Sequence, residues 1–151
     1  MDINEYMKKN KKIIKLAFKS LLVDLRKNSG LTQQSIADYL NIDISKIRNY
    51  EYLKIDSFDI TIFYFLKFIL NTPSHFIDAI INKKKEERQK IIISALQATR
   101  INSNTKIETI ADRYGVPNSY LYLFEDGIIS DEYPLIMYID YLFLGGNEYA
   151  K

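Results

Sequence analysis

The sequence predicts an all-α fold made of two copies of one small helical unit. Apolar residues recur at the three-and-four spacing of amphipathic helices in each copy, and no stretch of any length shows the alternating pattern of a strand. The chain also matches itself at an offset of 74 residues, with 14 identities over the 51 positions from Ser20 to Leu70. The identical pairs include Leu22/Leu96, Arg26/Arg100, Ile36/Ile110, Asp38/Asp112, Ser45/Ser119, Glu51/Glu125 and Tyr64/Tyr138.

The first helix of the first copy carries its apolar residues on one face. These residues are Ile14, Ala17, Phe18, Leu21, Leu22 and Leu25. Gly30 follows as a stop signal, because glycine readily takes the left-handed conformation that ends a helix.

Two short helices follow, joined by a tight turn. Thr32 is placed to cap a helix from Gln33 to Leu40, and Asp43 is placed to cap another from Ile44 to Tyr52. Asn41 lies in the turn and is matched by Gly115 in the second copy. Asparagine and glycine accept a positive φ most readily, so the sequence predicts the same turn geometry twice.

The rest of the chain continues this helical pattern. An apolar helix is expected at about Asp59 to Leu70, and Pro73 and Ser74 open a short fifth one. The second copy is expected to form helices at Ile91–Ile101, Lys106–Tyr114, Asn118–Asp126 and Pro134–Leu144. Residues 82–87 join the copies, so we expect one domain at 1–82 and a second at 83–151.

Composition argues against most enzyme classes. The chain has no cysteine and a single histidine, His75, and none of its five glycines lies in a phosphate-binding motif. We therefore expect no catalytic residues, no metal and no cofactor. The longest apolar stretches are short and carry Lys67 and Asp140, and the N-terminus does not resemble a secretory signal, so a cytoplasmic protein without a membrane span is expected.

Charge is distributed unevenly, although the net charge is only +2. Residues 1–82 carry 12 Lys and Arg against 9 Asp and Glu, and residues 83–99 carry 5 against 2. Residues 100–151 carry 4 against 8. Either the front of the chain suits a polyanionic partner, or the gradient is an ordinary solvated surface.

The run from Leu31 to Glu51, LTQQSIADYLNIDISKIRNYE, resembles the Cro/phage-repressor (XRE-like) helix-turn-helix family, and the resemblance extends from about Leu16 to Ile77. Members typically show Leu-Thr-Gln at the start of helix 2, an alanine within it, a glycine in the turn and a glutamate at the end of helix 3. Here Asn41 replaces the turn glycine. The second copy keeps Ile110-Ala111-Asp112, Gly115-Val116 and Glu125, and is a degenerate relative of the same unit. The resemblance implies two tandem lambda-repressor-like domains of four to five short helices each.

The resemblance implies that helix 3 of the first copy enters the major groove of double-stranded DNA. Ile44, Ser45 and Asn49 take base-facing positions, and Lys46 and Arg48 lie beside them. Asparagine can pair bidentately with adenine, and arginine can contact guanine or phosphate. Gln33 would hold a phosphate at the start of helix 2. The lysine cluster Lys8, Lys9, Lys11, Lys12 and Lys15 is either a DNA-contacting arm or an extension of helix 1.

An arginine and a glutamate recur in both copies, as Arg26 with Glu51 and Arg100 with Glu125. In related repressors this pair joins helix 1 to the end of helix 3 near the DNA backbone. Because the second copy lacks other DNA-binding features, we favour a structural clasp, with a phosphate contact by Arg26 as a further role.

The second copy carries Tyr120, Tyr122 and Leu123 where the first carries Lys46, Arg48 and Asn49. This loses the charge that dominates affinity for duplex DNA. Either the three residues form an interface for self-association or a protein partner, or they pack against the first copy.

The sequence thus predicts a sequence-specific transcriptional regulator, a repressor that binds DNA as a homodimer. The alternative is a protein-interaction module of the same fold, such as an antitoxin or a phage anti-repressor. A regulator that senses a small molecule lacks a recognisable ligand domain.

Overall fold

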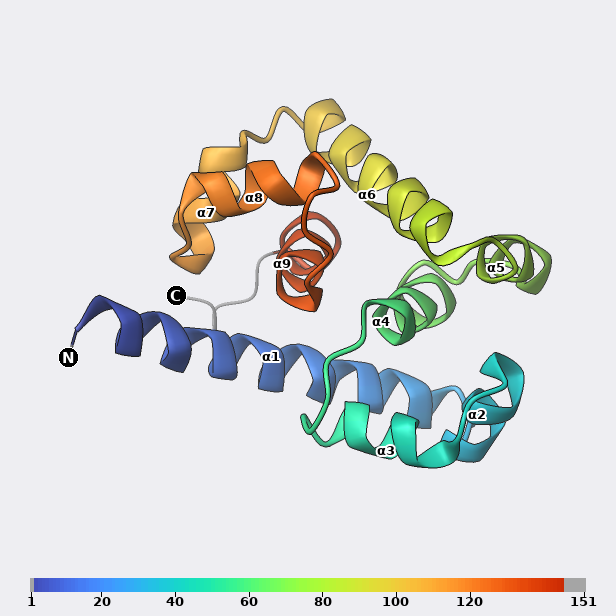
Figure 1. Ribbon diagram of the computed structural model, residues 1–151. Coiled ribbons are helices and arrows are strands. Elements are labelled where there is room, and N and C mark those ends of the chain that lie inside the picture. The colour runs from blue at the N-terminus through green and yellow to red at the C-terminus, as the bar shows by residue number, and fades with distance from the viewer. Residues whose placement is uncertain (1, 146–151) are drawn as a thin grey trace.

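The computed structural model describes residues 2–145, and these residues form helices and no strand (Figure 1), which confirms the all-α prediction. The helices are α1 (Ile3–Asn28), α2 (Gln33–Leu40), α3 (Ile44–Glu51), α4 (Phe58–Tyr64), a π-helical segment η1 (Phe65–Ile69), α5 (Ser74–Ile81), α6 (Lys85–Asn102), α7 (Ile107–Tyr114), α8 (Asn118–Glu125) and α9 (Glu132–Phe143).

The expected caps and turns are present around α2 and α3. Thr32 and Ser35 form a reciprocal capping box, in which the Ser35 amide donates to Thr32 Oγ1 at 3.0 Å and the Thr32 amide donates to Ser35 Oγ at 2.9 Å. Asp43 Oδ1 accepts from the Ser45 amide at 2.8 Å and caps α3. Asn41 has a φ of 56°, in the left-handed region, as does Gly115 at 68°.

The backbone repeats at the offset found in the sequence. α2 and α7, and α3 and α8, begin and end 74 residues apart, and so do the C-terminal ends of α1 and α6. All residues with positive φ in the described part of the chain form four pairs at this spacing. These pairs are Gly30/Asn104, Asn41/Gly115, Leu53/Gly127 and Asn71/Gly145. The order and spacing of these helices and turns therefore repeat along the chain, although the two sequences agree at a minority of positions.

Two helices are longer than the sequence predicted. α1 runs for 26 residues and includes the lysine cluster, which is therefore an extension of the first helix. α6 begins at Lys85, six residues before the expected start, so it takes up part of the predicted joint at 82–87. Lysine and glutamate are good helix formers without being apolar, so an apolar pattern underestimates such ends.

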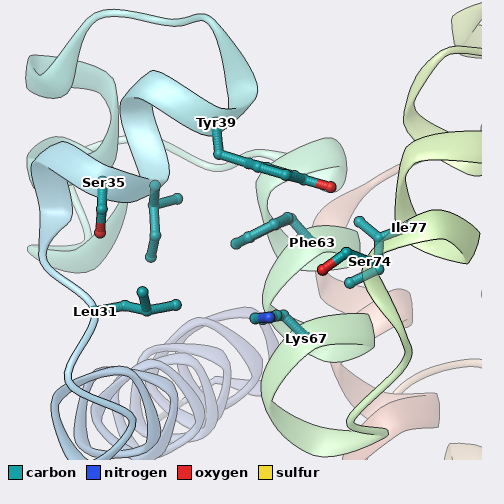
Figure 2. A pocket seen from close by; sticks show the side chains of 8 residues that line it. Leu31, Ser35, Tyr39, Phe63, Lys67, Ser74 and Ile77 are labelled. Atoms are coloured by element: carbon teal, nitrogen blue, oxygen red, sulfur yellow. The ribbon is translucent and has the colours of Figure 1, made fainter.

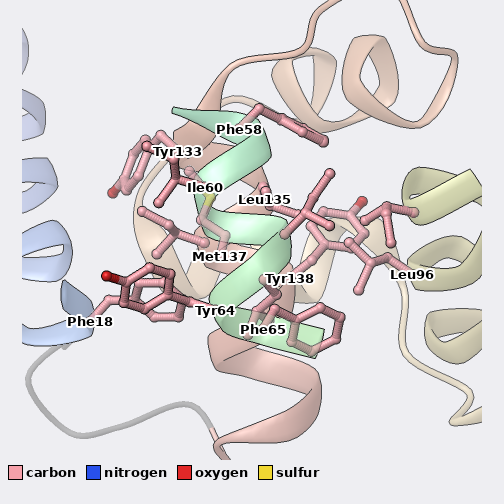
Figure 3. Packing of buried hydrophobic residues seen from close by; sticks show 14 of the residues in the cluster. Phe18, Phe58, Ile60, Tyr64, Phe65, Leu96, Tyr133, Leu135, Met137 and Tyr138 are labelled. Atoms are coloured by element: carbon pink, nitrogen blue, oxygen red, sulfur yellow. The ribbon is translucent and has the colours of Figure 1, made fainter. Parts of the chain in front are cut away.

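The core lies where α4 and α9 pack against each other, between α1 on one side and α6 on the other (Figure 1). Figure 3 shows side chains of both central helices in this space, with Phe18 of α1 and Leu96 of α6 at its borders. Every residue from Glu132 to Asp140 of α9 is buried. A helix without a solvated face needs partners on all sides, so the buried residues of both repeats form one continuous cluster.

The packing between the repeats is reciprocal. α1 of the first repeat contacts α9 of the second, and α6 of the second contacts α4 of the first. Because α6 and α9 are the counterparts of α1 and α4, this exchange is the pattern of an approximate two-fold arrangement. The division into domains at residue 82 stays a prediction, but the two repeats are in close contact.

One pair of positive-φ positions generates a stability prediction. Leu53 has a φ of 65°, which is strained for a residue with a Cβ, whereas its counterpart Gly127 adopts 75° without that strain. We expect Leu53→Gly to raise the free energy of unfolding and Gly127→Ala to lower it, each by about 1 kcal/mol. Denaturant unfolding followed by circular dichroism measures both; shifts in the same direction for the two variants would contradict this account.

Candidate nucleic-acid interface

Helices α2 and α3 pack against each other, and their inward side chains are buried in the core. Ile36 and Ala37 of α2 and Ile47 and Tyr50 of α3 are fully or almost fully buried. In the turn between the helices, the Ile42 amide donates to the Ala37 carbonyl at 3.0 Å. Because α3 is anchored through its inward residues, its outer face is held at a fixed angle to the rest of the fold.

The outer face of α3 holds most of the residues that the sequence singled out. Ser45, Lys46 and Arg48 are exposed, and Asn49 is half-buried. Ile44 is also half-buried and packs against the core, so it presents only part of its side chain. In Figure 1, α3 lies at the lower edge of the molecule, away from α7 and α8.

Exposed cations lie on this face and just beyond it. Lys54 is exposed just beyond α3 and adds a third cation to Lys46 and Arg48. Asp43 is the acid nearest in sequence, and the hydrogen bond from the Ser45 amide holds the pKa of its carboxyl below the usual value. The outer face of α3 therefore combines cations with hydrogen-bonding side chains on an accessible helix.

Behind this face, Arg26 and Glu51 form a clasp between α1 and α3. Arg26 Nε donates to Glu51 Oε2 at 2.7 Å and Nη2 donates to Oε1 at 2.9 Å, while Nη1 donates to the Leu31 carbonyl at 3.0 Å. Tyr64 Oη of α4 donates to Glu51 Oε2 at 2.5 Å. All three guanidinium nitrogens of Arg26 are thus engaged within the fold.

Gln33 belongs to the same network. Its Nε2 donates to Glu51 Oε1 at 2.9 Å, a contact that the sequence did not predict. Burial raises the pKa of Glu51, but the hydrogen bonds from Arg26, Tyr64 and Gln33 outweigh it and bring the pKa below the usual value. The ionised carboxylate therefore links the start of α2, the end of α3 and α1.

The second repeat contains the same clasp. Arg100 Nε and Nη2 donate to Glu125 at 2.6 and 2.8 Å, and Nη1 donates to the Thr105 carbonyl at 3.0 Å. Tyr138 Oη donates to Glu125, as Tyr64 does to Glu51. The structure thus brings each of the two sequence-predicted pairs together, in equivalent positions.

The outer face of α8 is chemically different from that of α3. Tyr122 is 46% exposed and Leu123 is 39% exposed, whereas Tyr120 is half-buried and donates to Asp131 at 3.2 Å. Tyr122 Oη donates to Glu108 at 2.7 Å. Ile128 just beyond α8 is 68% exposed and extends this apolar surface; it stands at the position of Lys54. The sequence analysis did not single out Ile128. The alignment of the repeats could have done so, because it pairs Ile128 with Lys54, and a lysine at the matching position suggests a solvent-exposed site.

No family model, curated protein or solved structure matches this chain. Among the helices of residues 2–145, none has the length and apolar character needed to span a membrane.

A cavity of about 160 Å³ lies behind α2, lined by residues of α2, α4, η1 and α5 (Figure 2). Tyr39 lies beside Phe63 in the lining, with ring centres 5.4 Å apart, and Ser74 and Ile77 approach them from α5. The cavity is smaller than the roughly 300 Å³ of typical ligand pockets. It therefore gives no basis for a small-molecule site.

The clasp generates a stability prediction. Arg26→Ala leaves the buried Glu51 carboxylate without its cation, so we expect a loss of about 3–5 kcal/mol in the free energy of unfolding. Lys27→Ala, at the next and exposed position of α1, should change it by no more than about 0.5 kcal/mol. Denaturant titration of the two variants measures the difference, and equal effects would show that the clasp contributes nothing particular.

Proposed function

We propose that the chain is a sequence-specific DNA-binding regulator of the Cro/phage-repressor type, with α2–α3 as its helix-turn-helix and α3 as the recognition helix. The observation that carries the proposal is the contrast between two equivalent helices. Both α3 and α8 are held by the same clasp, but only α3 presents exposed cations, Lys46 and Arg48, on its outer face.

The contacts proposed for this helix follow from the chemistry of its side chains. Asn49 pairs with adenine, Arg48 contacts guanine or a phosphate, and Ser45 and the exposed part of Ile44 meet base edges. Lys46 neutralises a phosphate. Binding occupies a promoter sterically, which requires no chemistry and no cofactor.

Residues behind the helix have a supporting part in this proposal. Gln33 holds a phosphate together with the amides at the start of α2, while Glu51 orients its amide group. Arg26 acts through Glu51, because its guanidinium nitrogens are engaged inside the fold. These contacts fix the angle at which α3 meets the groove.

DNA binding is tested with the full chain on sites selected from random or genomic DNA. We expect Arg48→Ala and Asn49→Ala each to lower the affinity for the selected site by about tenfold or more, since a bidentate base contact contributes about 1–3 kcal/mol. Lys46→Ala should weaken binding to all sequences and reduce the salt slope by about 1. Fluorescence anisotropy at several salt concentrations measures these effects.

Lys106→Ala is the matched control, because it removes an exposed cation from the second repeat, away from α3. Its affinity should equal that of the wild type. If all four variants bind equally well, or if no duplex is selected above background, the assignment of α3 is refuted.

The exposed apolar surface of Tyr122, Leu123 and Ile128 favours a second function, protein binding. In the regulator, this surface joins two chains into a homodimer that spans two DNA half-sites. If protein binding were the sole activity of the chain, the chain would be a protein-interaction module such as an antitoxin or an anti-repressor. A steep loss of DNA affinity with rising salt supports the regulator, because phosphate contacts release counterions.

Self-association through α8 has its own test. Tyr122→Ala and Ile128→Asp should lower the mass of the assembled protein, because they remove apolar contact area and add a charge. Tyr52→Ala, which removes an exposed tyrosine from the first repeat, should leave the mass unchanged. Multi-angle light scattering measures the mass; equal masses for all three variants and the wild type would rule out this interface.

A further inference from the structure

A polar cluster is buried where the two repeats meet. We call Lys19, Tyr50, Thr61 and Glu132 the junction cluster; they come from α1, α3, α4 and α9. Lys19 is 1% exposed and Glu132 is 4% exposed. Charged side chains are rarely buried to this degree unless they are paired, so the cluster requires an explanation.

Lys19 connects three segments at once. Its Nζ lies 3.2 Å from Glu132 Oε1, donates to the Ile55 carbonyl at 3.1 Å, and lies 3.9 Å from the centre of the Tyr50 ring. Tyr50 is on the inward face of α3, and Ile55 follows that helix. One ammonium group therefore contacts α9, α3 and the segment that leaves α3.

Glu132 completes the cluster from the second repeat. Its Oε1 accepts from Thr61 Oγ1 at 2.9 Å and from the Ser57 amide at 3.2 Å. Thr61 Oγ1 is also hydrogen-bonded to Tyr50 Oη at 2.5 Å. A carboxylate on α9 thus accepts hydrogen bonds from groups of the first repeat, and one of those groups bonds to α3.

The second repeat has the same order and spacing of helices without such a cluster. At an offset of 74 residues, the counterparts of the cluster are all apolar. Lys19, Tyr50 and Thr61 correspond to Ile93, Phe124 and Leu135 of the second repeat, and Glu132 corresponds to Phe58 of the first. These four counterparts are buried. The shared pattern of helices therefore does not require polar groups at these four positions, and in the first repeat they lie beneath the helix that carries the exposed cations.

Burial acts against both charges, since it lowers the pKa of Lys19 and raises the pKa of Glu132, and each charge partly offsets the effect on the other. Removing Lys19 would leave the buried Glu132 carboxylate with only Lys15, whose Nζ lies 3.9 Å from Oε2, and removing Glu132 would leave the buried ammonium without its closest carboxylate. Either loss costs more than the intact pair contributes. The two residues therefore act as a unit.

We propose that Lys19 and Glu132 are positioning residues for α3, through which α9 of the second repeat fixes the recognition helix of the first. The positioning of α3 is a structural role; its consequence for DNA binding rests on the proposed function. The second repeat is then part of the DNA-binding unit, even though its own helix α8 does not enter DNA.

The test compares three variants of the full chain. Glu132→Gln and Lys19→Met break the cluster, while Ile110→Ala opens a cavity in the fully buried core of α7, away from α3. Hydrogen exchange is measured at a temperature at which circular dichroism shows each variant folded. In Glu132→Gln and Lys19→Met, we expect the amides of residues 44–56 to exchange about tenfold faster or more than in the wild type, after normalisation to the amides of α6. In Ile110→Ala the same amides should exchange little faster than in the wild type.

Equal acceleration in all three variants would overturn the proposal, because the cluster would then be ordinary core. If Lys19→Met does not fold, Glu132→Gln and Thr61→Val decide the question by the same measurement. Lys19→Arg keeps the positive charge and should retain more of the protection of residues 44–56 than Lys19→Met does; equal loss in both would count against a role for the cation.

DNA affinity provides a second measurement. For the selected site, Glu132→Gln and Lys19→Met should bind about tenfold or more weakly, and Ile110→Ala should bind like the wild type while folded. If the exchange pattern appears but the wild type binds no DNA, the proposed function fails and the positioning of α3 stands. If the wild type binds DNA and all three variants match it in affinity and in exchange, the positioning role is refuted and the proposed DNA-binding function stands.

Discussion

Helix α9 has no solvated side over residues 132–140, and this constraint determines how the chain is arranged. A helix of this kind is stable only with neighbours all around it, and it takes them from both repeats: α1 and α4 from the first, and α6, α7 and α8 from the second. The N-terminal half of α1 also reaches α7 of the second repeat, where Asn10 donates to the Tyr114 carbonyl at 3.0 Å. The two repeats therefore depend on one shared core.

The arrangement also separates the two outer faces. α3 lies on one side of α1, and α7 and α8 lie on the other (Figure 1). A duplex in contact with α3 would thus leave α8 accessible, and the apolar surface of Tyr122, Leu123 and Ile128 would remain available to a second protein. The Arg–Glu–Tyr clasp recurs behind both helices, whereas their outer side chains and the buried groups beneath α3 differ between the repeats. Function on a shared fold is determined by such sites.

Local physical rules made much of this fold predictable. Thr32 and Asp43 are capping residues, and the pair Asn41/Gly115 unites the two residue types that accept a positive φ, so the boundaries of α2 and α3 followed from the sequence. Leu53 gave no such signal, because leucine disfavours the conformation that it adopts here. The fourth helix was expected to run unbroken to Leu70, but it changes to a π-helical segment at Phe65. Nothing in the periodicity of apolar residues distinguishes that change.

The candidate site was predictable where it is local and hidden where it joins distant segments. The outer residues of α3 follow one another in the sequence, so a local pattern could single them out as candidates. Lys19 and Glu132 lie in different repeats, so no local pattern connects them. The alignment of the repeats nevertheless contained a signal, since polar Lys19 is aligned with Ile93 and polar Thr61 is aligned with Leu135. Two repeats with the same order of helices provide an internal comparison: a residue that is polar in one and apolar in the other is not required by the pattern they share. Buried polar residues without a polar counterpart also occur in the second repeat, where Tyr114 Oη donates to Asp140 at 2.6 Å and the matching residues are Leu40 and Leu66. Lys19 and Thr61 differ from these in lying beneath the face of α3, and their contacts connect them to that helix.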